Sequence, residues 1–103
     1  MIKKAVRMKL YPGLKEEYAK RHNELWPEMR AMLKEHGAQS YSIFYDPETD
    51  YLFGYLEIED EEKWAQTAGT AINRKWWDFM VDMMETNPDN SPVTVELEQV
   101  FEL

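Results

Sequence analysis

Tyr51–Ile58, which reads YLFGYLEI, is the stretch that decides the fold of this 103-residue chain. Successive side chains of a β-strand point to opposite faces of the sheet. One face of this predicted strand therefore carries the aliphatic residues Leu52, Leu56 and Ile58, and the other carries the aromatic residues Tyr51, Phe53 and Tyr55. A sheet with one face in water normally alternates apolar with polar residues. Because this strand is apolar on both faces, we expect both faces of the sheet to be covered.

The flanking sequence predicts three more strands. Gln39–Tyr45 is joined to the first strand by the turn-forming residues 46–50, so the two should form a hairpin. Ile2–Leu10 places its apolar side chains mostly on one side, with period two. Val93–Leu97 alternates in the same way, and Val100 then breaks the alternation, which suggests a β-bulge.

Two helical segments separate these strands. The first carries apolar residues at spacings of three and four from Leu14 to Leu33, with a break expected at Pro27 because proline lacks an amide hydrogen. The second follows Asp60, a favourable N-cap, and continues to Met83 after an interruption near Gly69-Thr70.

The element order is therefore β-α-β-β-α-β, which predicts an α+β, ferredoxin-like fold over a single domain, residues 1–103. Both helical segments should pack on one face of a four-stranded antiparallel sheet. Two helices cannot cover both faces, so we expect a second subunit to cover the other. The predicted assembly is a homodimer with sheet against sheet, a dimeric α+β barrel.

Composition excludes several classes of protein. Twenty acidic residues against twelve basic ones give a net charge of −8, which argues against nucleic acid and anionic membranes as partners. The absence of cysteine excludes disulfides and thiolate metal sites. No apolar run is long enough to span a bilayer. We therefore expect a cytoplasmic protein.

His22 is the first candidate for chemistry. It lies on the apolar stripe of the first helical segment, one turn from Tyr18 and one turn before Trp26. Histidine titrates near neutral pH and can act as general acid or general base. The alternative is a buried histidine that merely satisfies a backbone carbonyl or a tyrosine. His36, in contrast, is expected to interact with the last carbonyls of its helix.

Aromatic residues supply the second set of candidates. Trp76 and Trp77 are adjacent on a helix, so they point to two different surfaces, and an indole suits the C–H-rich face of a sugar. Tyr41 lies on a central strand and could present its hydroxyl to a pocket. Packing alone is the alternative for all three. Since the chain has no phosphate-binding loop, nucleophile elbow or metal-ligand spacing, we expect proton transfer and aromatic binding without metal or cofactor.

Several of these motifs together resemble the L-rhamnose mutarotase family over essentially the whole chain. The segments that carry the resemblance are Arg21–Glu28, His36–Ala38, Arg74–Trp77 and Asn87–Val93. The family consists of dimers of ferredoxin-like subunits. The resemblance implies an isomerase of carbohydrate metabolism that interconverts the α and β anomers of L-rhamnose.

The resemblance also implies roles for individual residues. His22 matches the family's proton donor, and Tyr18, Tyr41, Trp76 and Trp77 match positions that contact substrate. The second acid–base group stays open: Tyr18, Tyr41, a carboxylate or water could serve. Two rival functions are a monooxygenase of the dimeric α+β barrel kind, including haem-degrading members, and a non-catalytic sugar-binding domain.

Overall fold

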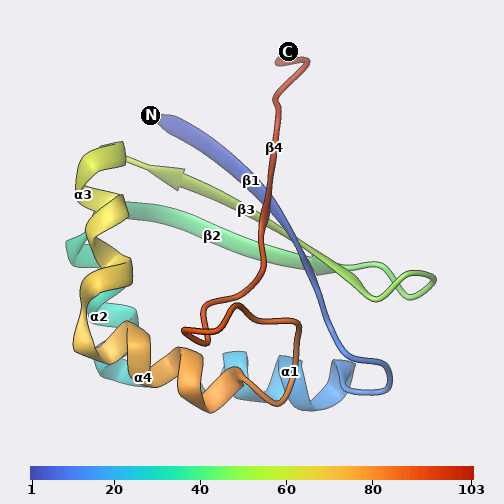
Figure 1. Ribbon diagram of the computed structural model, residues 1–103. Helices are drawn as coiled ribbons and strands as arrows, with labels where there is room; N and C mark the ends of the chain where they lie inside the picture. The colour runs from blue at the N-terminus through green and yellow to red at the C-terminus, as the bar shows by residue number, and fades with distance from the viewer.

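A four-stranded antiparallel sheet forms the centre of the computed structural model, which describes all residues 1–103 (Figure 1). The strands run in the order β2-β3-β1-β4 across the sheet. Their bounds are β1 Ile2–Lys9, β2 Ala38–Tyr45, β3 Tyr51–Ile58 and β4 Val95–Leu97. The predicted ferredoxin-like α+β fold is confirmed.

Each predicted helical segment is divided, and the pieces gather on one side of the sheet (Figure 1). Their bounds are α1 Lys15–Asn23, α2 Pro27–Glu35, α3 Glu61–Ala65, the 3-10 turn η1 Gln66–Gly69 and α4 Ala71–Met80. None of them combines the length and the apolar character that crossing a membrane requires.

The helix boundaries follow from local chemistry. Pro27 begins α2, and the residue before it, Trp26, is extended with φ −57° and ψ 133°, as expected before proline. The carboxylate of Asp60 caps α3 by accepting the amide hydrogen of Glu62 at 2.8 Å. Thr70, extended at ψ 145°, separates η1 from α4. The breaks predicted at Pro27 and near Gly69-Thr70 are therefore both confirmed.

The two faces of the sheet differ in burial. Along β3, Leu52, Gly54, Leu56 and Ile58 are buried and the residues between them are half-buried. The buried set belongs to the inner face, and its Leu52 packs with the helices in a core that contains Met8, Leu10, Tyr18, Met29, Met32, Trp76, Met80, Met83 and Met84. The other side, which we call the open face, has no helix on it. Phe44 on this open face is 64% exposed.

The C-terminal part departs from the predicted pattern. Strand β4 covers only Val95–Leu97, because the amide of Val93 instead donates to the carbonyl oxygen of Glu85 at 3.1 Å. No bulge forms at Val100, since residues 98–103 have no regular structure and extend away from the body of the chain (Figure 1). The sheet's irregularity lies between Ala38 and Ser40 instead. Met83 lies in a turn beyond α4, not in the helix.

Candidate active site

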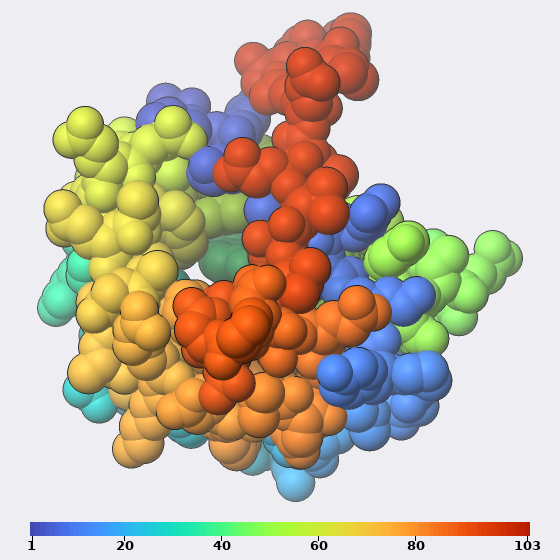
Figure 2. All heavy atoms as spheres, in the orientation of Figure 1, coloured from blue at the N-terminus to red at the C-terminus, as the bar shows by residue number.

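A pocket of about 840 Å³ lies between the inner face of the sheet and the helices. This volume falls in the range usual for small-molecule sites. Figure 2 shows a hollow on the surface between α3 and β4, the side on which Trp64 and Thr94 line the pocket. Of its 29 lining residues, 18 are hydrophobic.

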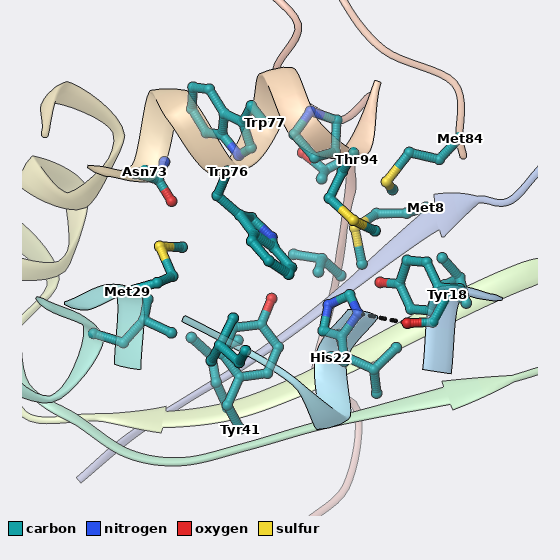
Figure 3. Close-up of a pocket in the computed structure, with 18 of the residues that line it drawn as sticks. Met8, Tyr18, His22, Met29, Tyr41, Asn73, Trp76, Trp77, Met84 and Thr94 are labelled. Atoms are coloured by element: carbon teal, nitrogen blue, oxygen red, sulfur yellow. Dashed lines mark hydrogen bonds between the residues drawn. The ribbon is translucent and has the colours of Figure 1, made fainter. Parts of the chain in front are cut away.

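All five residues singled out in the sequence line this pocket: Tyr18, His22, Tyr41, Trp76 and Trp77. Tyr18 and His22 lie one turn apart on α1 and face the same way. Tyr41 reaches in from the inner face of β2, and the two tryptophans come from α4 (Figure 3). The fold thus brings together side chains from three elements that are distant in sequence.

The hydrogen bonding of His22 fixes its tautomer. Its Nδ1 lies 3.0 Å from the carbonyl oxygen of Tyr18 (Figure 3). A carbonyl oxygen can only accept, so Nδ1 carries the hydrogen and donates it. In the neutral ring Nε2 then holds a free lone pair, and no side chain or backbone group of the protein is bonded to it. This nitrogen is the proton acceptor that the pocket offers.

Aromatic rings surround the imidazole. The ring of Tyr18 is tilted against it with centroids 4.3 Å apart, and Trp76 meets it edge-on at 5.4 Å. Burial among these rings lowers the pKa of His22, and the hydrogen bond to the Tyr18 carbonyl opposes this only in part. The imidazole is therefore neutral near pH 7, as a general base should be.

The two tyrosines are held in their protonated form. Burial raises the pKa of the Tyr18 hydroxyl, and the neighbouring Tyr41 raises it further. Burial likewise raises the pKa of Tyr41, although 42% of that residue is exposed. The hydroxyl of Tyr41 lies close to β3, 3.7 Å from the place a Cβ on Gly54 would occupy. Both hydroxyls are therefore available as hydrogen-bond donors.

The tryptophans divide their roles. Trp76 is only 7% exposed and packs edge-on against Trp26 at 5.1 Å as well as against His22. Trp77 is half-buried, and the guanidinium of Arg74 lies 6.0 Å from its ring. Trp76 therefore both packs in the core and lines the pocket, with its ring directed toward His22 and Tyr41, whereas Trp77 lies on the other side of α4 (Figure 3).

No carboxylate lines the pocket, although the chain has twenty acidic residues. The lining cations are Lys4, Lys15 and Arg30, and Lys4 forms ion pairs with Glu61 at 2.8 Å and Glu96 at 3.3 Å. His36 lies outside the pocket and bonds through Nδ1 to the carbonyl oxygen of Met32 at 2.8 Å, as predicted for a residue at a helix end. His22 is therefore the one side chain in the pocket that titrates near neutral pH. No three His, Cys, Asp or Glu side chains gather where they could hold a metal ion.

Sequence reasoning missed three residues that shape this pocket. Gly54 lets the inner face approach closely, since a Cβ there would stand 3.2 Å from Val6 and 3.5 Å from the ring of Tyr41. A glycine inside a strand is a signal for such an approach. Thr67 and Asn73 also line the pocket and are buried. Both residues flank the start of a helix, where polar residues are expected as caps, so the sequence did not indicate that they line a pocket.

Comparison with known proteins places the chain in a family. The family model for L-rhamnose mutarotase matches residues 3–103. The L-rhamnose mutarotase of Enterococcus faecalis is 65% identical over 103 residues, covering 100% of both chains. That of Lachnoclostridium phytofermentans is 60% identical and covers 100% of this chain and 99% of its own. The crystal structure of L-rhamnose mutarotase from Formosa agariphila is similar with a TM-score of 0.92 at 45% identity, covering 100% and 99% of the two chains.

More distant similarity concerns the fold alone. A putative antibiotic biosynthesis monooxygenase from Nitrosomonas europaea has a TM-score of 0.64 at 14% identity, with 96% of this chain and 89% of the other covered. The rival function considered for the sequence, a monooxygenase, thus shares this architecture. Shared architecture does not carry activity with it.

Proposed function

We propose that this chain, which belongs to the L-rhamnose mutarotase family, interconverts the α and β anomers of L-rhamnose by acid–base ring opening and reclosure. One observation supports the mechanism most directly: a neutral imidazole presents a free Nε2 to an aromatic pocket that contains no carboxylate. In this proposal residues 1–103 act as one mutarotase domain, and the activity is that of an isomerase.

The chemistry needs two proton movements at neighbouring atoms. Nε2 of His22 takes the proton of the anomeric hydroxyl, the bond between C1 and the ring oxygen breaks, and the ring oxygen receives a proton. The resulting aldehyde rotates about the C1–C2 bond and recloses on its other face by the reverse steps. Both oxygens are attached to C1 in the closed sugar, so a single nitrogen can serve them in turn. His22 then acts first as base and next as the proton donor.

The tyrosines support these steps without carrying charge. A protonated hydroxyl can donate to the oxygen on which negative charge develops, and the raised pKa values of Tyr18 and Tyr41 keep both hydroxyls protonated. One general acid or base contributes about 10²- to 10⁴-fold to the rate. That contribution suits a reaction that already proceeds in water.

The two tryptophans of the pocket offer surfaces that suit a sugar. The indole faces of Trp76 and Trp77 can cover the C–H-rich face of the sugar, and their N–H groups can donate to hydroxyls. A sugar held in this way places its anomeric carbon near His22, since Trp76 contacts the imidazole directly.

We also propose a homodimer, joined through the open face. Phe53 pairs across strands with Phe44, and Val95 and Leu97 of β4 are exposed on the same face, with no helix to cover them. The tail beyond β4 carries further exposed apolar residues, Val100, Phe101 and Leu103. A second copy of the chain would bury both features. We place the protein in the cytoplasm, with which the absence of cysteine agrees.

Saturation-transfer NMR tests the function directly. Irradiating one anomeric proton of L-rhamnose should transfer saturation to the other anomer at a rate proportional to enzyme concentration. L-Fucose and D-glucose, measured in the same way, report selectivity. A protein that binds L-rhamnose without accelerating exchange would be a sugar-binding domain and would contradict the proposal. Binding of haem with no exchange would instead favour the monooxygenase.

A further inference from the structure

Thr67 and Asn73 form a polar pair in the pocket that the proposed mechanism does not use. Thr67 is 9% exposed and Asn73 5% exposed, and both line the pocket. Neither side chain makes a hydrogen bond within the protein: only the carbonyl oxygen of Thr67 and the backbone amide of Asn73 are engaged. Buried polar groups normally have partners.

These polar groups face open space. No fully buried side-chain nitrogen or oxygen in the structure lacks a partner, so the unbonded carboxamide of Asn73 must keep access to the pocket. Figure 3 shows the side chain of Asn73 directed into the pocket, on the opposite side of Trp76 from His22. The carboxamide is thus positioned for a ligand and for no group of its own chain.

The backbone around the pair is fixed by Thr70. Its hydroxyl donates to the carbonyl oxygen of Thr67 at 2.8 Å and accepts the backbone amide hydrogen of Asn73 at 3.3 Å. One threonine therefore ties the last turn before α4 to the first turn of α4. These bonds fix the backbone of Thr67 and Asn73, and the polar groups of their side chains stay free to bond to a ligand. Such a site is preorganised for binding.

We propose that Thr67 and Asn73 form a hydroxyl-binding subsite that recognises the sugar hydroxyls remote from the anomeric carbon. The inference rests on the proposed function. A carboxamide both donates and accepts, so it can bond to a sugar hydroxyl in either direction. Asn73 precedes Trp76 by three residues, so these two share one side of α4. A sugar stacked on the indoles with C1 at His22 directs its other hydroxyls toward this subsite.

Asn73→Leu tests the subsite, with affinity read from quenching of tryptophan fluorescence. L-Rhamnose and its 2-, 3- and 4-deoxy derivatives are titrated into the native protein and the variant. We expect the variant to bind L-rhamnose about tenfold more weakly, because one hydrogen bond is lost. With the deoxy sugar that lacks the recognised hydroxyl, the substitution should have little further effect. An equal weakening for all four sugars, or none, would overturn the proposal.

Thermal unfolding gives a second, independent readout. Leucine fills a similar volume and removes an unpartnered polar group, so the midpoint of Asn73→Leu should stay the same or rise. A merely structural asparagine would lower it. Thr67→Val is a second and more conservative variant, which keeps the test available even if Asn73→Leu fails to fold. It should weaken the binding of L-rhamnose and have little further effect on the deoxy sugar that lacks the hydroxyl it contacts. If Thr67→Val changed the affinities for all four sugars equally, or changed none of them, this result would count against the subsite.

Thr86→Val supplies the matched control, because Thr86 is half-buried and lies outside the pocket. It should leave the affinities for all four sugars unchanged. Failure of this inference is separable from failure of the proposed function. Anomer exchange by the native protein tests the function alone, whereas the sugar-dependent loss in the variants tests the subsite alone.

Discussion

The Nδ1 hydrogen of His22 is committed to the carbonyl oxygen of Tyr18, 3.0 Å away and one turn earlier on the same helix. This bond leaves Nε2 as the only ring nitrogen that can exchange a proton with a ligand. It also fixes the orientation of the imidazole relative to Trp76, which it meets at 90°. The proposed catalysis therefore passes through one nitrogen of one residue.

The rate of anomer exchange should fall as the pH is lowered below neutrality. Burial lowers the pKa of His22 below its ordinary value of 6.5, so the neutral, active ring persists at neutral pH and is lost only as pH falls through the lowered pKa. The same shift means that the unfolded chain takes up this proton more readily, so His22 also makes the fold less stable as pH falls below 6.5. Saturation-transfer NMR across pH 4 to 9 tests the rate. An acid limb centred above 6.5 would contradict the burial of the ring.

Replacing His22 with glutamine should abolish most of the activity. Glutamine keeps polarity and approximate size but cannot shuttle a proton near neutral pH. We expect a loss of about 10²-fold or more in exchange rate, with the fold and sugar binding retained. Thermal unfolding and fluorescence titration are the controls. Near-native exchange would remove His22 from the mechanism, and loss of activity through unfolding would return it to a purely structural role.

Trp76 and Trp77 should respond differently to substitution by phenylalanine. Trp77 is half-buried at the pocket, so Trp77→Phe should weaken sugar binding with little effect on stability. Trp76 also packs on Trp26 and His22, so Trp76→Phe should lower both sugar affinity and stability, the latter by about 1 to 3 kcal/mol. Denaturant unfolding combined with sugar titration separates the two effects. Unchanged affinity in Trp77→Phe would favour packing as its only role.

Local patterns in the sequence were sufficient for much of this structure. The period-two alternation of Tyr51–Ile58 predicts which residues are buried, because a strand has only two faces. The spacing between Tyr18 and His22 places both on one side of α1 for the same geometric reason. Pro27 breaks the first helical segment because of its own covalent structure. In each case the cause acts over a few residues.

Other features depend on contacts between distant elements, and the sequence did not reveal them. No carboxylate lines the pocket because of the way in which the helices and strands assemble. The twenty acidic residues of the chain would not have predicted this. Gly54 shapes the pocket only because Val6 and Tyr41 lie close to it in the folded sheet. Val93 fits a strand pattern, yet its amide bonds to Glu85 in the preceding loop, and β4 is correspondingly short.

The proposed homodimer gives the last prediction, because it concerns the face that no element of the chain covers. Phe44 is 64% exposed and pairs across strands with the half-buried Phe53, so a charge at position 44 would lie within the proposed interface. We expect the native protein to sediment as a dimer at micromolar concentration and Phe44→Glu to sediment as a monomer. Ala31→Glu, which places the same charge on an exposed position of α2 in the helix layer, is the matched control and should stay dimeric.

This experiment also separates two ways in which the open face could fail to form an interface. A native protein that sediments as a monomer would show that the apolar open face alone does not drive association. A dimer that persists in Phe44→Glu but dissociates in Ala31→Glu would move the interface to the helix layer. Only dissociation specific to Phe44→Glu agrees with the proposal, in which one face of Tyr51–Ile58 packs on the chain's own helices and the other on a second copy.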